Sequence, residues 1–408
     1  MIRSIFVSLI ILACFVSSCT KELEPDNSVV DNPPDSIDKP IDSIAVIRLD
    51  SIVPALARIG DTVTLFGHDF SGVTNAQIRI GNDSAEIVEI TSDRIKFIVR
   101  YKFTTANINL QSETTLIEGP GIGYRYIAKV TTIAGTGVAG FQDGAGYSAA
   151  FKCPWGLAFD KEGHLLVADN YNHRLRKIDL TGPGGPYVTS TDLTSFQFYN
   201  PYNIAVDTTS NTIFITNFNT DIAKIDELGF PVEYHFPMME TTTGIAIGRD
   251  RRVYVSDNIG HKLYSMNQDG QDVQQLPQSV FTPRDVVVDQ EGRLYTINSH
   301  VMEVLPDGTL THFEQEELLG GWGFAIDADG NFVEADHANN RIQRVDRKTG
   351  KITVIAGNGL AEDIDGIGLE ASFNAPMSLV FDQEGNLYVS TYNFDTKGGN
   401  KIRKITFE

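Results

Sequence analysis

The stretch Pro154-Trp-Gly-Leu-Ala-Phe-Asp160, Lys-Glu-Gly-His164, Leu-Leu-Val-Ala-Asp169, Asn-Tyr-Asn-His-Arg174, Leu-Arg-Lys-Ile178 decides the fold of this 408-residue chain. Its apolar runs at 157–159 and 165–168 are short, rich in strand-forming residues and separated by a Glu-Gly turn signal. Residues 174–178 alternate polar and apolar side chains, as a strand with one wetter face does. The stretch therefore predicts three short strands joined by two tight turns.

Most of the chain repeats this unit. Each copy opens with residues like Pro-x-Gly, continues as an apolar run, and leads to a second strand-forming run. The copies begin at Pro154, Pro201, Gly244, Pro283, Gly321 and Pro376. Six copies spaced 38 to 55 residues apart, with several strands in each, are typical of propeller blades. Because one blade cannot bury both of its faces, the copies are expected to stack radially into a closed ring.

A second repeat predicts how the ring closes. Val130-Thr-Thr-Ile-Ala-Gly-Thr-Gly137 resembles Ile352-Thr-Val-Ile-Ala-Gly-Asn-Gly359, and each precedes an Asp-Gly loop and a Phe. The later copy is expected to be the outer strand of its blade. The last blade, residues 376–405, has no outer strand of its own, so residues 130–134 are expected to complete it and leave no open edge. The predicted fold class is all-β.

These residues resemble the NHL-repeat family of six-bladed β-propellers. The shared pattern is Pro-x-Gly-(Leu/Ile)-Ala-(Phe/Val)-Asp followed by Asp-x-x-Asn-x-Arg-(Ile/Leu), and residues 169–175 and 336–342 match its second part fully. The third copy departs from it at Gly260 and Lys262, and the fourth shortens the turn near His300. The resemblance covers roughly residues 129–408. It is specific for fold and not for function, because such propellers include lyases, hydrolases and binding modules.

The N-terminal residues predict export and anchoring. Met1-Ile-Arg3 and the apolar run 5–16 have the charged head and short core of an export signal. Residues 12–19 resemble a bacterial lipoprotein signal, which implies a signal peptide at 1–18 and a lipidated Cys19; a plain secretory signal is the alternative. The acidic residues at 20–24 resemble the surface-export tag of outer-membrane lipoproteins in glycan-degrading gut bacteria. Residues 19–43, rich in Asp and Pro, predict a disordered tether.

Residues 44–127 predict a separate β unit before the propeller at 128–408. Several short alternating strands within about eighty residues indicate a sandwich. The stretch Gly60-Asp-Thr-Val-Thr-Leu-Phe-Gly-His-Asp-Phe70 resembles the IPT/TIG family of immunoglobulin-like domains. This resemblance implies a rigid spacer, and a second binding face is the alternative.

Charge and cysteine content exclude some functions. The formal net charge is −20, and the only cluster of basic residues, at 249–252, is expected to be an exposed turn. Binding to nucleic acid needs a basic face, so the sequence predicts none. If Cys19 is acylated, the mature protein has no intramolecular disulfide. Cys153 is expected to be a small packed residue rather than a nucleophile.

The strand order places the Pro-x-Gly positions and the Asp-x-x-Asn turns on one rim of the ring. At the x position the copies carry Trp155, Tyr202, Thr243, Arg284, Trp322 and Met377, expected to surround the channel mouth. Exposed aromatic rings around a concavity suit sugar rings, whose C–H faces stack on π surfaces; the alternative is that some rings pack between blades. The predicted ligand-binding residues are Trp155, Tyr171, His173, Tyr202, Phe218, Arg284, Trp322, His337 and Tyr392.

The expected function is therefore capture of polysaccharide or oligosaccharide at the cell surface, on the outer membrane, alongside glycan-uptake proteins. Contact with the membrane is expected through the lipid alone. No catalytic residue, metal or cofactor is predicted. One open alternative is a metal-dependent lyase or hydrolase at the channel mouth, where His173, His261, His300 and His337 share the rim; Asp285 and Asn203 alone would make a poor calcium cage. Another alternative is a protein–protein interaction platform.

Overall fold

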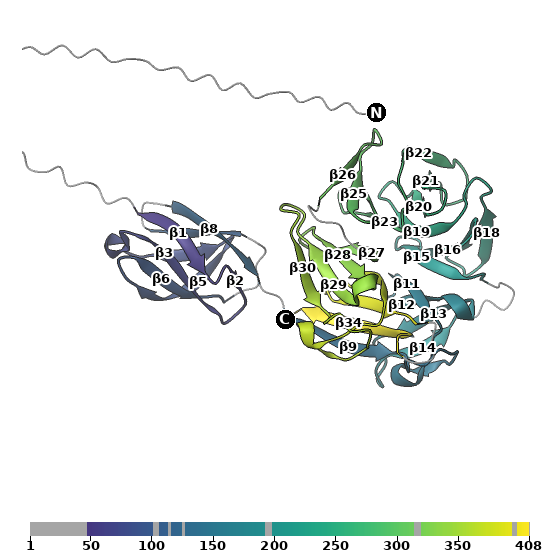
Figure 1. Cartoon of the computed structure of the whole chain (residues 1–408), viewed down its shortest axis with the longest axis horizontal. Coiled ribbons are helices and arrows are strands. Elements are labelled where there is room, and N and C mark those ends of the chain that lie inside the picture. Colours follow the sequence, from purple (N-terminus) through teal and green to yellow (C-terminus); the bar gives the residue numbers. More distant parts are fainter. Residues whose placement is uncertain are drawn as a thin grey trace, which may run out of the picture. The chain divides into compact units, whose positions relative to one another are not determined.

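The computed structural model describes residues 47–100, 106–112, 116–124, 127–191, 198–313, 320–393 and 398–407 (Figure 1). The predicted signal peptide, Cys19 and tether lie outside the described residues. Within them, regular structure consists of β-strands and five short 3₁₀ turns, so the all-β prediction is confirmed. The described part of the chain contains no helix long and apolar enough to span a membrane.

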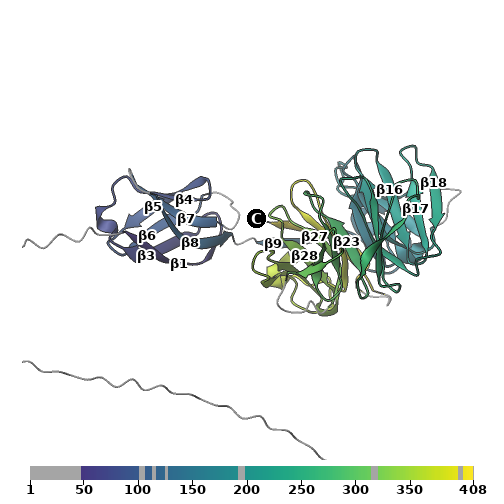
Figure 2. The ribbon, with the colours of Figure 1, turned by 90° about the horizontal axis from the view of Figure 1, so that it is seen from above.

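The N-terminal domain has eight strands, paired in the order β1-β3-β6-β5-β4-β7-β8-β2. Most of them are labelled in Figure 2. β5 pairs with β6 on one side and with β4 on the other, and it thereby joins two groups of strands, antiparallel except for the parallel pair β2 and β8. Both groups bury alternate apolar side chains, such as Leu65 and Phe97 in one and Ile78 and Leu110 in the other, as the layers of a sandwich do. The strands are Arg48–Val53 (β1), Leu56–Ala57 (β2), Thr62–His68 (β3), Gln77–Ile80 (β4), Asp83–Ile90 (β5), Arg94–Ile98 (β6), Ala106–Gln111 (β7) and Leu116–Tyr124 (β8).

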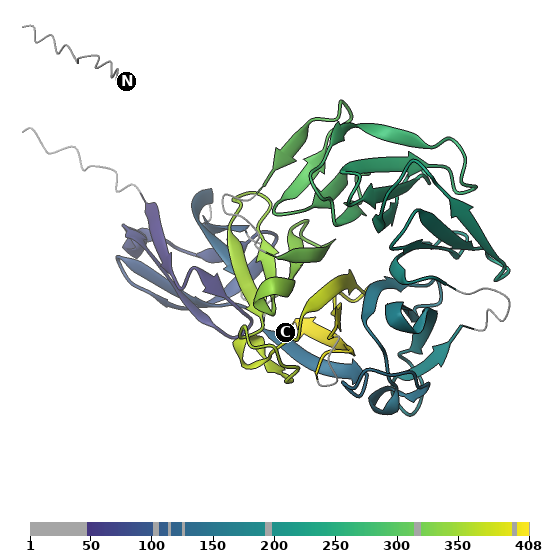
Figure 3. The same ribbon diagram turned by 45° about the vertical axis from the view of Figure 1, so that its right-hand side comes forward.

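Six antiparallel sheets follow and stand around one central axis as the blades of a propeller (Figure 3). Blade 1 contains Pro154–Phe159 (β11), Leu165–Asp169 (β12), Arg174–Asp179 (β13) and Tyr187–Ser190 (β14), with Gly144–Ala145 (β10) at its edge. Blade 2 contains Pro201–Asp207 (β15), Thr212–Asn217 (β16), Asp221–Ile225 (β17) and Pro231–His235 (β18). Blade 3 contains Thr242–Ile247 (β19), Val253–Asp257 (β20), Lys262–Met266 (β21) and Gln274–Ser279 (β22).

The second half of the ring follows the same plan. Blade 4 contains Asp285–Val288 (β23), Leu294–Ile297 (β24), Val301–Val304 (β25) and Leu310–His312 (β26). Blade 5 contains Gly321–Ile326 (β27), Phe332–Asp336 (β28), Arg341–Val345 (β29) and Ile352–Ala356 (β30). Blade 6 contains Pro376–Phe381 (β32), Leu387–Thr391 (β33) and Lys401–Phe407 (β34), joined by Ala128–Ala134 (β9) and Gly366–Ile367 (β31).

Blade 6 closes the ring as the repeat pattern predicts. β9 pairs antiparallel with β34, from Ala134 opposite Ile402 to Ala128 opposite Phe407. The first strand of the propeller thus forms the outer strand of its last blade. This pairing covers the edge that β34 would otherwise expose, and the predicted closure is confirmed.

Two buried arginines hold the loops that follow β9 and β30. In blade 6, the guanidinium of Arg403 donates to Asp363 and Asp365 and to two backbone carbonyls. In blade 1, Arg176 makes the equivalent bonds to Asp143 and Asp169 and to the carbonyls of residues 142 and 150. Each loop is therefore tied to its blade by a desolvated cation that is paired with carboxylates and backbone carbonyls, although Arg403 Nε has no hydrogen-bond partner among the described residues.

The third residue of the Pro-x-Gly unit alternates around the ring. Blades 1, 3 and 5 carry Gly156, Gly244 and Gly323, while blades 2, 4 and 6 carry Asn203, Asp285 and Ser378. A Cβ on Gly156 would lie 2.5 Å from the Cα of Asn203, and one on Gly244 would lie 2.4 Å from the Cα of Asp285. Glycine is therefore needed where the next blade approaches, and three polar side chains gather at the channel.

Candidate functional site

The inner strands begin on the face where the second strands end, as expected from the strand order. Pro154 pairs with Asp169 in blade 1, and Pro376 pairs with Thr391 in blade 6. The Pro-x-Gly positions and the second turns therefore share one face of the propeller, which we call the aromatic face.

Six predicted residues meet on this face in one aromatic cluster: Trp155, Tyr202, Phe218, Trp322, His337 and Tyr392. Trp155 lies at its centre, with ring-centroid distances of 4.0 Å to Tyr202 and 6.3 Å to Trp322. Phe218 stacks on Tyr202 at 5.1 Å, and Tyr392 stacks on His337 at 5.7 Å. Rings from blades 1, 2, 5 and 6 thus form one continuous surface.

The cluster corrects the expectation that these residues surround an open mouth. Tyr202, Thr243 and Met377 are buried, and the cavity beneath the rings measures only about 20 Å³. The rings fill the mouth because large apolar surfaces gain more from contact with one another than from standing apart in water. For Tyr202, Thr243 and Met377 the packing alternative therefore applies, while Trp155, Trp322 and Tyr392 stay half-buried and Phe218 is 44% exposed.

Polar groups accompany the rings. The Arg284 guanidinium lies 5.2 Å from the Trp322 ring centroid and donates to the Gly321 carbonyl, and its partial burial lowers the pKa of Arg284. Burial also raises the pKa of Tyr202 well above its usual value, so its hydroxyl remains protonated. Within the described part of the chain, Trp155 Nε1, the Tyr202 hydroxyl and His337 Nδ1 are buried atoms without a hydrogen-bond partner, which is uncommon for groups of this kind.

The two remaining aromatic residues of the prediction, His173 and Tyr171, have neighbours of their own. His173 stacks on Tyr199 at 5.9 Å, and its Nδ1 accepts a hydrogen bond from the backbone of Asn200. Tyr171 is 42% exposed, with the Lys152 ammonium 5.9 Å from its ring centroid.

Two of the rim histidines, His261 and His300, contact neighbours outside the aromatic cluster. His261 stacks on Phe281 and accepts from the backbone of Thr282, while His300 packs against His312. Among the described residues, the one group of three side chains close enough to share a metal ion is Asp160, Glu162 and His164, in a turn at the other end of the blade. Lys177 already pairs with Asp160 there.

Cys153 is not suited to act as a nucleophile. Burial raises the pKa of its thiol to about 12, so the thiolate form is disfavoured.

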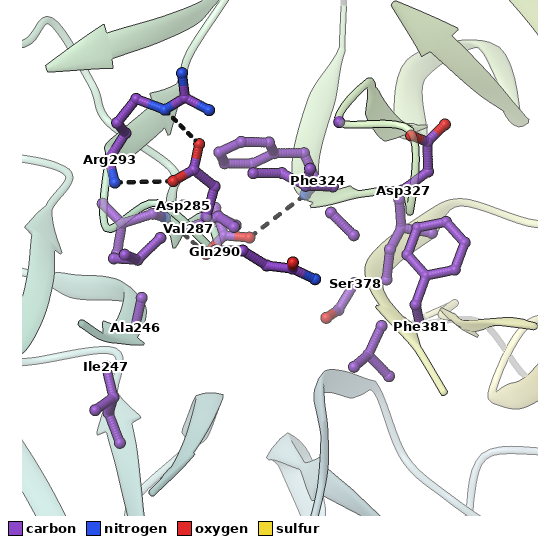
Figure 4. A pocket seen from close by; sticks show the side chains of 18 of the residues that line it. Ala246, Ile247, Asp285, Val287, Gln290, Arg293, Phe324, Asp327, Ser378 and Phe381 are labelled. Carbon is purple, nitrogen blue, oxygen red and sulfur yellow. Dashed lines mark hydrogen bonds and ion pairs between the residues drawn. The ribbon is translucent and has the colours of Figure 1, made fainter. Parts of the chain in front are cut away.

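The opposite face holds a cavity of about 600 Å³ that the sequence reasoning missed (Figure 4). Its walls come from the inner strands and include Ile247, Val287, Leu379 and Phe381. Its inner end carries Asn203, Asp285 and Ser378, the alternating polar residues described above. The signal in the sequence was this alternation of Gly with Asn, Asp or Ser, which becomes meaningful once the blades are placed around the axis.

Asp285 is the carboxyl group at the inner end of this cavity. One carboxylate oxygen accepts from Asn203 Nδ2 at 2.9 Å and from the Val286 backbone, and the other accepts from the Phe324 backbone at 3.4 Å. These bonds favour the ionised form, but desolvation outweighs them and raises the pKa of Asp285 to about 7.

Comparison with known proteins assigns both domains. The family model of the IPT/TIG domain matches residues 48–117, and that of the NHL repeat matches residues 151–178. Together with the six blades, these matches define the class: an IPT/TIG domain followed by a six-bladed NHL-repeat β-propeller.

The curated relatives are distant. Protein SUPPRESSOR OF QUENCHING 1, chloroplastic, of Arabidopsis thaliana is 24% identical over 294 residues, which are 65% of this chain and 26% of that protein. The human NHL repeat-containing protein 2 is 27% identical over 119 residues, which are 27% of this chain and 16% of that protein. The chain thus spans about a quarter or less of the relatives it matches.

Solved structures share the fold over most of the chain. A protein of unknown function from Bacteroides thetaiotaomicron is 20% identical with a TM-score of 0.58, covering 90% of this chain and 99% of its own. An auxiliary nutrient binding protein from the same species is 18% identical with a TM-score of 0.54, covering 89% and 98%. One from Bacteroides ovatus is 15% identical with a TM-score of 0.53, covering 89% and 98%. At these identities the likeness establishes the fold.

Proposed function

We propose that the propeller binds carbohydrate through its aromatic face. The observation that carries this proposal is the cluster of six contiguous rings, contributed by blades that lie far apart in the sequence. A continuous aromatic surface offers stacking platforms for the C–H faces of successive sugar rings along a glycan chain. The exposed edge of the cluster, formed by Phe218 and the half-buried Trp322 and Tyr392, would make the first contacts.

Hydrogen-bonding groups near the rings support a polar, hydroxyl-rich ligand. The Arg284 guanidinium donates to one backbone carbonyl and has further N–H groups to offer. His337 Nδ1 and Trp155 Nε1 lack partners within the described residues, so a ligand or water that reaches them would satisfy them. A sugar combines apolar faces with hydroxyl edges and therefore suits both features.

The setting of this activity is part of the same proposal. A lipidated Cys19, with residues 19–43 as a tether and the IPT/TIG domain as a spacer, would hold the propeller on the outer surface of the cell, beside outer-membrane glycan-uptake proteins. Two structural neighbours described as auxiliary nutrient binding proteins support the binding part of the proposal by analogy of fold.

Affinity electrophoresis tests the proposal. The Cys19→Ala protein would be run through gels containing a panel of neutral and acidic polysaccharides, with Phe218→Ala and Tyr392→Ala as test variants. The matched control is Phe281→Ala, because Phe281 is 72% exposed and contacts His261 outside the cluster. We expect retardation by one polysaccharide, lost in the two test variants and kept in the control. Equal mobility in all gels would favour a protein–protein platform instead, and a metal that survives dialysis would favour the enzyme alternative.

A further inference from the structure

The cavity on the face opposite the aromatic cluster has the properties of a ligand site of its own. Its volume of about 600 Å³ falls within the range of small-molecule pockets, and its lining combines aliphatic side chains with charged and polar ones. The rings of Trp155, Tyr202 and Trp322 close the channel on the other side, above a space of only about 20 Å³. A molecule in this cavity would therefore be separate from a glycan bound at the aromatic face.

Asp285, at the inner end of this cavity, is a carboxylate without a counter-ion. Its three hydrogen-bond donors, on Asn203, Val286 and Phe324, are all neutral amides. Among the described residues, no basic side chain forms an ion pair with it; the neighbouring Arg284 instead donates to Gly321 and stacks on Trp322. A carboxylate has about four lone-pair positions, so one remains for a further donor.

The other charges around the cavity also favour a cation. Five carboxylates and two guanidinium groups line it: Asp285, Asp289, Glu291, Asp327, Asp329, Arg293 and Arg347. The carboxylates at its outer edge already have arginine partners, such as Arg293 for Asp289 and Arg344 for Asp327. The lining is nevertheless net negative, and a concave surface of one sign concentrates ions of the other.

We propose that this cavity binds a small organic ammonium ion, with its charged head on Asp285 and an apolar body against Ile247, Val287 and Leu379. Ser378, whose hydroxyl accepts from the Leu157 backbone, still has its own proton to donate to a polar substituent. An inorganic divalent ion fits less well. Calcium takes six to eight oxygen ligands, whereas the Asn203 oxygen is turned to the Ile204 backbone and Asp285 is the single carboxylate at this depth.

Isothermal titration of the Cys19→Ala protein at pH 8 tests this site with two probes of one skeleton, cyclohexylmethylammonium chloride and cyclohexylmethanol. We expect saturable one-to-one binding of the ammonium, about tenfold or more tighter than the alcohol. Asp285→Asn should reduce the affinity for the ammonium to that for the alcohol. Gln290→Trp should weaken both probes, because Gln290 lines the cavity (Figure 4) and a larger ring there would occupy part of it.

The controls separate this site from the aromatic face. Phe218→Ala should leave both probe affinities unchanged, and loss of glycan binding in that variant would not alter the ammonium result. Equal affinity for the two probes, or unchanged ammonium binding in a folded Asp285→Asn protein, would overturn the proposal. Displacement of the ammonium by calcium chloride with one-to-one stoichiometry would reassign the site to an inorganic ion. If Asp285→Asn does not fold, the comparison of the two probes and the Gln290→Trp variant still test whether the cavity binds the ammonium ion.

Discussion

The indole rings of Trp155 and Trp322, which come from blades 1 and 5, lie 6.3 Å apart between centroids and are tilted by 35° to each other. Their contact spans the channel mouth and, with Tyr202, closes it. The propeller consequently presents a filled aromatic surface on one face and an open cavity on the other. The two proposed ligands would therefore occupy separate faces of the propeller.

Removal of the central ring should cost stability as well as binding. Trp155→Ala is expected to lower the free energy of unfolding by about 3 kcal/mol, because truncation of a packed tryptophan leaves a cavity. Phe218→Ala, at the exposed edge of the cluster, is expected to cost about 1 kcal/mol. Urea denaturation followed by tryptophan fluorescence measures both, since the chain has two tryptophans and both lie in the propeller. Equal losses in the two variants would show that Trp155 is not packed as described.

The loop after β30 should depend on Arg403. This guanidinium is fully buried and pairs with the buried Asp363, so Arg403→Ala is expected to destabilise the propeller by about 3–5 kcal/mol, since it leaves an uncompensated charge. The matched control is Arg251→Ala, which removes an exposed guanidinium; its buried partner Asp207 keeps hydrogen bonds from Gln268 and the Thr209 backbone, so the loss should be smaller, about 1–2 kcal/mol. Thermal or urea unfolding of the two variants side by side would reveal the difference; a loss at Arg403 no greater than at Arg251 would contradict the role of the buried pair.

The contribution of Asp285 to stability should fall as pH rises from about 5 to 7. The pKa of Asp285 is about 7 in the folded state and about 3.9 in an unfolded chain, so within this window only the folded state keeps the proton. Each pH unit then lowers the free energy of unfolding by about 1.4 kcal/mol for this one group. Asp169, whose pKa burial raises to about 6, adds to the same slope at lower pH.

Two variants test whether the slope near neutral pH comes from Asp285. Asp285→Asn should flatten the plot of stability against pH between about pH 6 and 7, where Asp285 titrates more than Asp169 does. Asp289→Asn should leave that region alone and instead change the profile between about pH 2 and 4, because hydrogen bonds and Arg293 lower the pKa of Asp289 to about 2. Urea midpoints measured across pH 2 to 8 give both profiles. An unchanged slope in Asp285→Asn would refute the raised pKa.

The anchor is tested by fractionation. If Cys19 is lipidated, Cys19→Ala should move the protein from the membrane fraction to the soluble fraction of the expressing cells. Cys153→Ala is the control, because Cys153 is a buried residue of the propeller and its removal should leave the membrane attachment unchanged. Membrane association of the Cys19→Ala protein would count against lipidation.

Much of the fold could be predicted from the chain alone. The number of blades follows from the recurrence of one unit, and the closing strand β9 follows from the likeness of residues 130–137 to residues 352–359. Both features depend on strand-length patterns of apolar residues and on turn residues, which are local properties of a sequence. The sharing of one face by the Pro-x-Gly positions and the second turns follows in the same way from strand order.

The contacts between blades could not be predicted from these local patterns. Whether Trp155 lines an open mouth or packs on Trp322 depends on how closely six inner strands approach the axis, and that distance is set by packing between residues far apart in the chain. The cavity beside Asp285 arises for the same reason, since the alternation of Gly156, Gly244 and Gly323 with Asn203, Asp285 and Ser378 has no spatial meaning until the blades stand in a ring. Local patterns therefore specify the blades and their closure, whereas burial and steric fit among distant residues determine which face is filled and which is open.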